Sequence, residues 1–262
     1  MAQLIKGSEI SKQIREEIGR EMKELKDKHG IVPGLATILV GEDPGSKVYV
    51  GQKEKACSKL GIYSERTDLP GDVSEADVLG LVDQLNDNPK INGILVQLPL
   101  PKQIDETRII NAIDPDKDVD CFHPINVGKL MIGTGRFLPC TPHGIMELLK
   151  RSNIPTEGKH VVVIGRSNIV GKPIANLMLQ PPPVGGNATV TICHSKTKDL
   201  AAFTATADIL IVAIGKPRAI GADMVKDGVV VIDVGVNRVG KTDEGKAILA
   251  GDVDFESVEK KA

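Results

Sequence analysis

The chain has 262 residues, of which 41% are hydrophobic and 26% charged, enough for one large or two ordinary globular domains without a disulfide or metal. Its formal net charge of -2 gives no electrostatic reason to expect nucleic acid or an anionic membrane, so we expect a small-molecule partner. The four cysteines are widely separated, and neither a signal peptide nor a membrane-spanning apolar run occurs, which favours a reducing, cytoplasmic compartment. The five histidines lack zinc-ligand spacing, so we expect no metal site.

The first half of the chain alternates helical and strand-like hydrophobic patterns. Helical spacing is found at 8–30, 46–60 and 74–86. Short apolar runs are found at 34–40 and 91–98, and 62–69 is a weaker strand candidate. This alternation predicts a parallel sheet. The following segment, 114–135, is rich in Asp, Pro, Asn and Gly without clear periodicity, so we expect a domain hinge between residues 122 and 142.

The second half repeats the alternation with longer apolar strands. Thr141 and Pro142 suit the N-cap and first turn of a helix through Lys150. Apolar strands follow at 160–164, 188–193, 209–214 and 229–234. We therefore predict an α/β protein of two domains, with a βα-repeat catalytic domain at 1–122 and a doubly wound, Rossmann-like domain at 123–262.

A glycine-containing turn follows the first strand of the second half. It runs from Gly165 to Gly171 and leads into a helix, a geometry that can lay backbone N–H groups against a pyrophosphate. Ser167 stands where the usual fingerprint has its middle glycine. On spacing alone, an ordinary tight turn is an equally good interpretation.

The next strand ends in Cys-His-Ser-Lys-Thr, without the acid that usually binds the ribose of NAD. Arg166, Ser195 and Lys196 could instead converge on an adenosine 2′-phosphate, which favours NADP. The alternative is that both cations are ordinary solvated loop residues. Gly235 and Asn237, after the last apolar strand, occupy a loop that could approach the nicotinamide.

One predicted helix, 46–60, carries a lysine within an apolar stripe. The stripe consists of Val48, Tyr49, Gln52, Lys53, Ala56, Cys57 and Leu60. Desolvation there would disfavour the charged form of Lys53 and lower its pKa toward the range useful in acid–base chemistry. Tyr49, one turn earlier, could stack on a flat ligand. The alternative is that the lysine extends its amine into solvent.

Two further polar positions lie near predicted strand ends. Gln97 interrupts an apolar strand at its carboxyl end, where parallel sheets bind ligands, although it could instead satisfy loop backbone. Asp114, Asp116, Asp118 and Asp120 alternate as in a calcium loop. Counted from Asp116, however, the sixth and twelfth positions are Cys121 and Val127 instead of Gly and Glu, which excludes calcium. We expect most of these aspartates at the surface, with Asp120 the best candidate to face a pocket.

Several stretches together resemble the bifunctional methylenetetrahydrofolate dehydrogenase/cyclohydrolase family. They occur in the family's order at 46–57, 96–101, 116–120, 139–142, 165–173, 193–195, 233–237 and 251–253. The resemblance implies oxidation of 5,10-methylenetetrahydrofolate by NADP to the methenyl form, followed by hydrolysis to 10-formyltetrahydrofolate, a step in one-carbon metabolism and purine biosynthesis. It also implies a homodimer formed through the nucleotide domain.

The same resemblance assigns roles to individual residues. Lys53 would be the catalytic lysine, Tyr49 would stack on the folate, Gln97 would assist the lysine and Asp120 would hold the pterin. NADP would be bound by Gly165, Arg166, Ser167, Ile169, Gly171, Ser195 and Val236.

The end of the sequence departs from the family pattern. Family members continue into a Pro-Gly-Gly-Val-Gly-Pro-Met-Thr loop and a closing helix, so we expect either a longer chain beyond Ala262 or a weakened folate site. The alternatives to the bifunctional enzyme are a dehydrogenase without cyclohydrolase activity, a shikimate-dehydrogenase-like enzyme and a catalytically silent ligand-binding protein.

Overall fold

The computed structural model describes residues 2–242 and 245–262 and divides the chain into two compact units. The N-terminal unit is Gly7–Leu138, and the C-terminal unit is Pro139–Ala262 together with the first residues of the chain, up to Lys6. The division lies inside the window in which we expected the hinge. Residues 123–138, which we assigned to the second domain, pack with the N-terminal unit.

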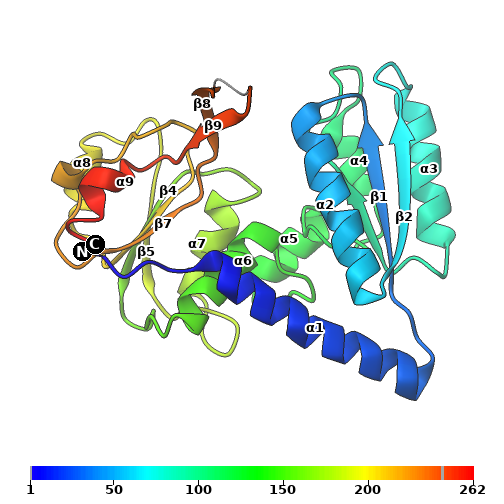
Figure 1. The fold of residues 1–262 in the computed structure, drawn as a ribbon, viewed down its shortest axis with the longest axis horizontal. Coiled ribbons are helices and arrows are strands. Elements are labelled where there is room, and N and C mark those ends of the chain that lie inside the picture. Colours follow the sequence, from blue (N-terminus) through cyan, green and yellow to red (C-terminus); the bar gives the residue numbers. More distant parts are fainter. Residues whose placement is uncertain (1, 243–244) are drawn as a thin grey trace. The chain divides into compact units, whose positions relative to one another are not determined.

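The N-terminal unit is a three-stranded parallel sheet with helices on its faces (Figure 1). Its strands are β1 (Gly34–Val40), β2 (Tyr63–Leu69) and β3 (Gly93–Val96), in the order β2-β1-β3. Its helices are α1 (Gly7–His29), α2 (Pro44–Leu60), α3 (Glu75–Asp87), α4 (Glu106–Ala112) and α5 (Pro124–Met131). The predicted parallel sheet is therefore confirmed.

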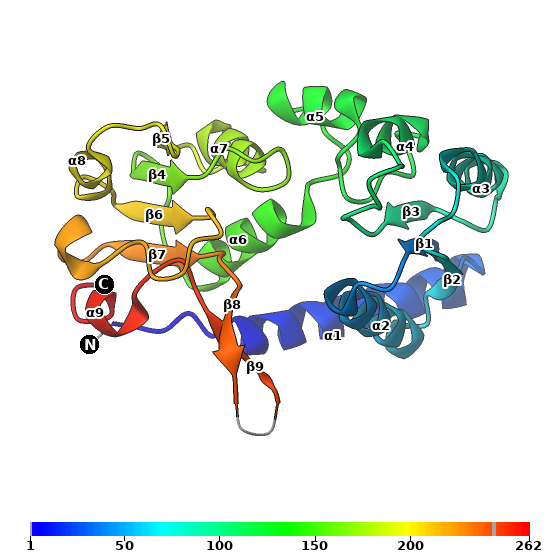
Figure 2. The same ribbon diagram turned by 90° about the horizontal axis from the view of Figure 1, so that it is seen from above.

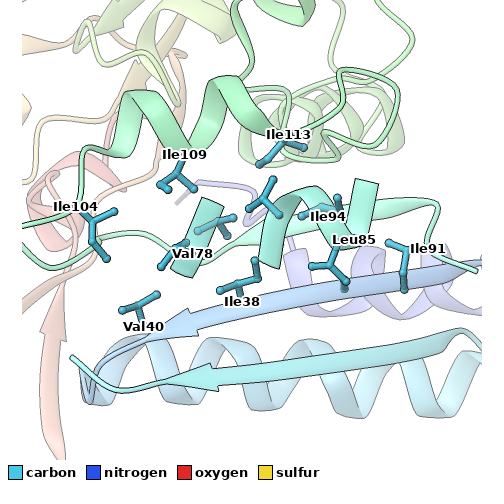
Figure 3. Close-up of a cluster of buried hydrophobic side chains, with 12 residues drawn as sticks. Ile38, Val40, Val78, Leu85, Ile91, Ile94, Ile104, Ile109 and Ile113 are labelled. Atoms are coloured by element: carbon cyan, nitrogen blue, oxygen red, sulfur yellow. The ribbon is translucent and has the colours of Figure 1, made fainter. Parts of the chain in front are cut away.

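The central strand β1 is buried on both faces, as its continuous apolar run predicted. Figure 3 shows Ile38 and Val40 of β1 facing Val78 and Leu85 of α3 in an aliphatic layer. Ile109 of α4 closes the same cluster and is fully buried. Because no aromatic ring fills this core, its packing depends on branched aliphatic side chains that interdigitate.

Local capping sets the start and end of α2, the helix that carries Lys53. The carboxylate of Asp43 accepts a hydrogen bond from the Ser46 backbone N–H at 2.8 Å, and this bond lowers the pKa of Asp43. Pro44 follows in the first turn, and Gly61 ends the helix in the left-handed conformation with φ +72°. The helix is therefore held at both ends by residues whose roles can be read from the sequence.

The C-terminal unit is built on a four-stranded parallel sheet, shown in Figure 2 with its strands in the order β5-β4-β6-β7. The strands are β4 (His160–Ile164), β5 (Thr189–Cys193), β6 (Ile209–Val212) and β7 (Val230–Asp233). The other elements are α6 (Cys140–Arg151), α7 (Gly171–Leu179), α8 (Leu200–Thr204), the 3-10 helix η1 (Ala222–Met224), the hairpin strands β8 (Asn237–Lys241) and β9 (Ala247–Ala250), and α9 (Phe255–Val258). Two aliphatic clusters cover the two faces of this sheet.

Three local expectations differ from the structure. The irregular segment contains the short helix α5, whose N-cap is His123; the Nδ1 of His123 accepts the Ile125 N–H at 3.1 Å. Thr141 is not the N-cap of α6, because that helix begins at Cys140 after Pro139, with no side-chain cap. The β8–β9 hairpin was not predicted. In the described ranges, no helix is both long and apolar enough to cross a membrane.

Candidate functional site

Lys53 and Gln97 lie together in the N-terminal unit, although they are 44 residues apart in sequence. Lys53 is on α2, and Gln97 directly follows β3, with its backbone N–H donating to the Ile38 carbonyl at 2.9 Å. The Lys53 Nζ donates a hydrogen bond to Gln97 Oε1 at 3.2 Å. This pair places an amine at the carboxyl edge of the sheet, where parallel sheets bind ligands.

The amide of Gln97 is oriented by its second hydrogen bond. Its Nε2 donates to the Leu98 carbonyl at 2.8 Å, so Oε1 is the atom left to face Lys53. Gln97 therefore does satisfy loop backbone, as the alternative interpretation held, and it also presents an acceptor to the lysine. Both functions come from one side chain.

The predicted apolar stripe of α2 does not coincide with the face of the helix that is buried. The buried residues are Ser46, Val50 and Cys57, whereas Val48 is 57% exposed and Tyr49 is 54% exposed. Lys53, which is partly buried, still lies on the buried side because it falls between Val50 and Cys57. The buried face is set by what packs against α2, which helical spacing alone does not show.

The segment around Asp120 is attached to the same sheet. Ile94 of β3 forms a parallel bridge with Asp118, and its N–H donates to the Lys117 carbonyl at 2.7 Å. Asp120, which is partly buried, comes two residues after this bridge. The bridge therefore brings the candidate pterin-binding carboxylate beside the strand that Gln97 follows.

The other members of this segment have structural roles. Lys117 Nζ donates to the backbone carbonyls of Leu85, Asn86 and Asn88 at the end of α3. Asp118 is buried, which corrects the expectation of a surface residue. Its carboxylate accepts hydrogen bonds from the N–H groups of Phe122 and His123 and from Asn126 Nδ2. Buried carboxylates need such donors, and here they anchor the start of α5.

Two cysteines on elements that carry the candidate sites, Cys57 and Cys193, are not activated nucleophiles. Burial raises the pKa of the Cys57 thiol on α2, and burial likewise raises the pKa of Cys193 at the end of β5. Both therefore remain protonated thiols near neutral pH. Within the parts of the chain that the structure describes, no group of three or more His, Cys, Asp or Glu side chains is placed to hold a metal ion.

The turn after β4 is closed by two close backbone approaches that require glycine. A Cβ on Gly165, whose φ is +127°, would lie 2.3 Å from the Ala213 carbonyl oxygen. A Cβ on Gly171 would lie 2.2 Å from the Gly165 carbonyl oxygen. These contacts bring β4, the start of α7 and the end of β6 together as a dinucleotide turn requires. An ordinary tight turn would not need both.

Ser167, in place of the middle glycine, caps the start of α7. Its Oγ accepts hydrogen bonds from the N–H groups of Val170 at 3.1 Å and Gly171 at 3.3 Å. The hydroxyl hydrogen remains a donor that can face an anion. Ile169, in the same turn, is 46% exposed.

The residues predicted to meet a 2′-phosphate are exposed on two adjacent strand ends. Arg166 is exposed in the turn after β4, and Ser195 and Lys196 are exposed after β5, the neighbouring strand. His194 shapes the second turn, because its Nδ1 accepts the Lys196 N–H at 3.2 Å. Within this turn no carboxylate is present to repel a phosphate, so the donor set fits NADP.

The loops after β6 and β7 are held by two carboxylates that our sequence reading did not single out. Residues 214–220 form the β6 loop, whose first three backbone N–H groups donate to the carboxylate of Asp252. Asp233, at the end of β7, accepts the Gly235 N–H. Val236, a predicted cofactor contact, is 63% exposed in the same turn. The available signal was an aspartate within two residues of a glycine at or just after the end of a strand, as in Asp233-Val234-Gly235 and Gly251-Asp252.

The chain matches both domains of one protein family. Residues 5–120 match the tetrahydrofolate dehydrogenase/cyclohydrolase catalytic domain, and residues 139–262 match the NAD(P)-binding domain of the same family. The "Bifunctional protein FolD" of Dehalococcoides mccartyi is 61% identical over 100% of this chain and 88% of its own length. The protein of that name from Syntrophus aciditrophicus is 61% identical over 99% of this chain and 88% of its own length.

Two solved structures support the same relationship. The bifunctional methylenetetrahydrofolate dehydrogenase/cyclohydrolase of Campylobacter jejuni is 48% identical, with a TM-score of 0.91 over 99% of this chain and 88% of the other. The dehydrogenase-cyclohydrolase of Trypanosoma brucei, complexed with NADP cofactor and an inhibitor, is 36% identical, with a TM-score of 0.92 over 100% of this chain and 88% of the other.

Proposed function

The chain belongs to the tetrahydrofolate dehydrogenase/cyclohydrolase family, and from this premise we propose that Lys53, held by Gln97, is the proton-transfer group of its active site. The protein is an NADP-dependent methylenetetrahydrofolate dehydrogenase and methenyltetrahydrofolate cyclohydrolase. This membership replaces the alternatives of a shikimate-dehydrogenase-like enzyme and a silent ligand-binding protein. What remains is to assign the residues that perform each reaction.

The cyclohydrolase reaction needs a group that moves protons. Water adds to the methenyl carbon and loses one proton, which leaves a hydroxyl group on that carbon. The bond from the carbon to N5 then breaks as the hydroxyl loses its proton and N5 gains one, leaving the formyl group on N10 and releasing one proton overall. A positioned amine can accept a proton from the water oxygen and supply a proton to N5. The hydrogen bond between Lys53 Nζ and Gln97 Oε1 carries this assignment, because it holds the amine in one place at the sheet edge.

The other residues of the N-terminal unit would bind and orient the folate. Tyr49 lies one turn before Lys53 and exposes more than half of its surface, which suits stacking on the flat pterin. Asp120 suits the hydrogen-bond donors of the pterin ring. Together with Gln97, these residues form the substrate-binding set that we propose.

The NADP site would lie at the carboxyl edge of the second sheet. A bound NADP would supply the acceptor for the hydride that leaves the methylene carbon. The turn from Gly165 to Gly171, including Ser167 and Ile169, would receive the pyrophosphate. Arg166 and Ser195 would bind the 2′-phosphate, with Lys196 beside them, and Val236 would lie near the nicotinamide.

We also propose a cytoplasmic homodimer whose 10-formyl product supplies purine biosynthesis. The exposed apolar side chains of Val239, Ile248 and Leu249 on the β8–β9 hairpin support a surface that a second copy could cover. The wide separation of the four cysteines in the sequence supports a reducing compartment. Sedimentation of the purified protein tests the dimer, and a monomer at micromolar concentration would contradict it.

The decisive experiment is the substitution Lys53→Met, measured in both reactions. Loss of a general acid–base group costs about 10²–10⁴-fold in rate, so hydrolysis of the methenyl substrate should fall by that amount. Lys55→Met is the matched control, because Lys55 is an exposed lysine on the same helix. Wild-type hydrolysis by Lys53→Met, with an unchanged unfolding temperature in both variants, would contradict the role.

A further inference from the structure

The carboxylate of Asp252 is completely buried in the C-terminal unit and is surrounded by four hydrogen-bond donors. Oδ2 accepts from the N–H groups of Ile214 at 2.7 Å and Gly215 at 2.9 Å. Oδ1 accepts from the Lys216 N–H at 2.8 Å and from Asn237 Nδ2 at 2.8 Å. This one side chain therefore joins the β6 loop to the turn that begins β8.

The backbone around Asp252 holds the rest of the β6 loop. The carbonyl of Gly251 accepts the Arg218 N–H at 3.0 Å. The carbonyl of Asp252 accepts the N–H groups of Ala219 at 2.7 Å and Ile220 at 3.2 Å. Ile220, at the end of the loop, also forms a parallel bridge with Val253, so the conformation of the β6 loop follows from the position of residues 251–253.

The backbone of Gly251 and Asp252 is in turn held by the carboxylate of Asp233. Its Oδ1 accepts the N–H of Asp252 at 3.0 Å and its Oδ2 accepts the N–H of Val253 at 3.0 Å. A Cβ on Gly251 would lie 1.8 Å from Asp233 Oδ2, and a Cβ on Gly235 would lie 2.2 Å from the Asp252 Cγ. The two carboxylates and two glycines thus leave no room for an alternative arrangement.

The position of this network in the sheet indicates what it serves. If the pyrophosphate lies over the turn after β4 and the 2′-phosphate lies on the β5 side, the nicotinamide end of the cofactor falls on the side of β6 and β7. Gly215 and Lys216 are exposed there, and a Cβ on Gly215 would meet nothing within 4 Å. The outer side of the β6 loop is therefore open, while its inner side is bound to Asp252.

We propose that Asp252 is a positioning residue for hydride transfer, which fixes the β6 loop and Asn237 so that the nicotinamide end of NADP is held in one geometry. The proposal rests on the NADP site proposed above. Asp252 does not touch the cofactor, because its oxygens are occupied by the four donors. A carboxylate is required because it offers two acceptor atoms, whereas an amide would turn a donor against two of these donors.

The test compares Asp252→Asn with Thr204→Val. Both are buried, near-isosteric changes in the C-terminal unit, and the Thr204 hydroxyl donates only to backbone carbonyls of Met224 and Ala201. Thr204→Val therefore measures what a comparable loss of buried hydrogen bonds does to the unit as a whole. For both variants we would measure unfolding, the two activities, and the binding of NADP and of adenosine 2′,5′-bisphosphate.

Asp252→Asn should lower the dehydrogenase kcat by about 100-fold, the effect expected when a reacting group is misplaced by roughly 1 Å. Hydrolysis of the methenyl substrate needs no NADP and should keep its wild-type rate. Binding of adenosine 2′,5′-bisphosphate should also be unchanged, whereas NADP should bind more weakly. Thr204→Val should leave the dehydrogenase kcat, the rate of hydrolysis and the binding of both ligands unchanged.

Two results would overturn the proposal. One is wild-type dehydrogenase kcat and NADP affinity in Asp252→Asn at a temperature where it is folded, and the other is an equal loss of both activities. Should Asp252→Asn fail to fold, amide hydrogen exchange of the wild-type protein replaces it: the N–H groups of Ile214, Gly215 and Lys216 should exchange slowly. Exchange at the rate of a free loop would refute the proposal. Absence of NADP turnover in the wild type would instead contradict the proposed function.

Discussion

The carboxyl edges of the two parallel sheets are built in different ways. In the N-terminal unit, the edge presents the side chains of Lys53 and Gln97, which are partly buried and joined by one hydrogen bond. In the C-terminal unit, the edge is mainly backbone, closed by glycines and held from within by Asp233 and Asp252. Proton transfer needs a side chain that can exchange its proton, whereas dinucleotide binding needs a backbone of fixed shape.

This difference predicts two kinds of mutational response. At the first edge, a substitution such as Lys53→Met should remove activity with little loss of stability, because few other groups depend on the amine. At the second edge, stability and cofactor binding should change together, because the same hydrogen bonds serve both. The next three tests, one of which has a control substitution, examine this comparison.

Arg166 would be an exception at the second edge, since it is an exposed side chain in the glycine turn. Arg166→Ala should weaken NADP binding by about 1.5–3 kcal/mol, the cost of losing a charge-assisted hydrogen bond, and should weaken NAD binding far less. Titration of both dinucleotides measures this. Equal losses for NADP and NAD would refute the 2′-phosphate assignment, and the free energy of unfolding should not change.

Gly251 tests the tightly packed part of the same edge. In Gly251→Ala the new Cβ would lie 1.8 Å from Asp233 Oδ2, and relieving such overpacking costs about 1–3 kcal/mol of unfolding free energy. NADP affinity should fall with it, while hydrolysis of the methenyl substrate should not.

The control for Gly251→Ala is Gly144→Ala, in α6. A Cβ on Gly144 would meet nothing within 4 Å, so this change should stabilise the protein by about 0.5–1 kcal/mol. Chemical denaturation of both variants gives the two values. A Gly251→Ala variant as stable as the wild type would show that the network can rearrange.

Asp208 lies at the amino end of β6, away from the cofactor edge, and should give the smallest effect. The hydrogen bond from Lys226 Nζ, followed by that from the His160 N–H, lowers the pKa of Asp208. A lowered pKa contributes stability above the unfolded-state pKa, and this contribution is lost as the pH falls through the folded-state value.

Asp208→Asn should therefore reduce the free energy of unfolding at pH 7 by less than about 1 kcal/mol, because the ion pair is partly exposed. The difference from the wild type should begin to shrink near the ordinary aspartate pKa of about 4 and should disappear below the lowered folded-state pKa of Asp208. Denaturation at several pH values measures this. Both activities should be unchanged, and a change in NADP binding would mean that the two edges of the sheet are coupled.

The sequence by itself determined most of the regular structure. The apolar runs at Gly34–Val40 and His160–Ile164 became β1 and β4 without any change of bounds. Strands buried on both faces are recognisable because every residue must be apolar, and capped amphipathic helices because their period is local. The glycine turn after β4, the residues around Lys53 and the family resemblance could be read from the sequence because each depends on residue types that lie close together along the chain.

The tertiary structure decided the features that depend on residues far apart in the chain. The buried face of α2 is set by what packs against it, so its phase was wrong although the helix was right. The pairing of Lys53 with Gln97 spans 44 residues, and Asp252 reaches Ile214 across 38 residues. Local periodicity indicates the type of an element, but the face that is buried depends on its packing partners. A hydrogen bond between distant residues exists only after the sheets have assembled and brought their loops together.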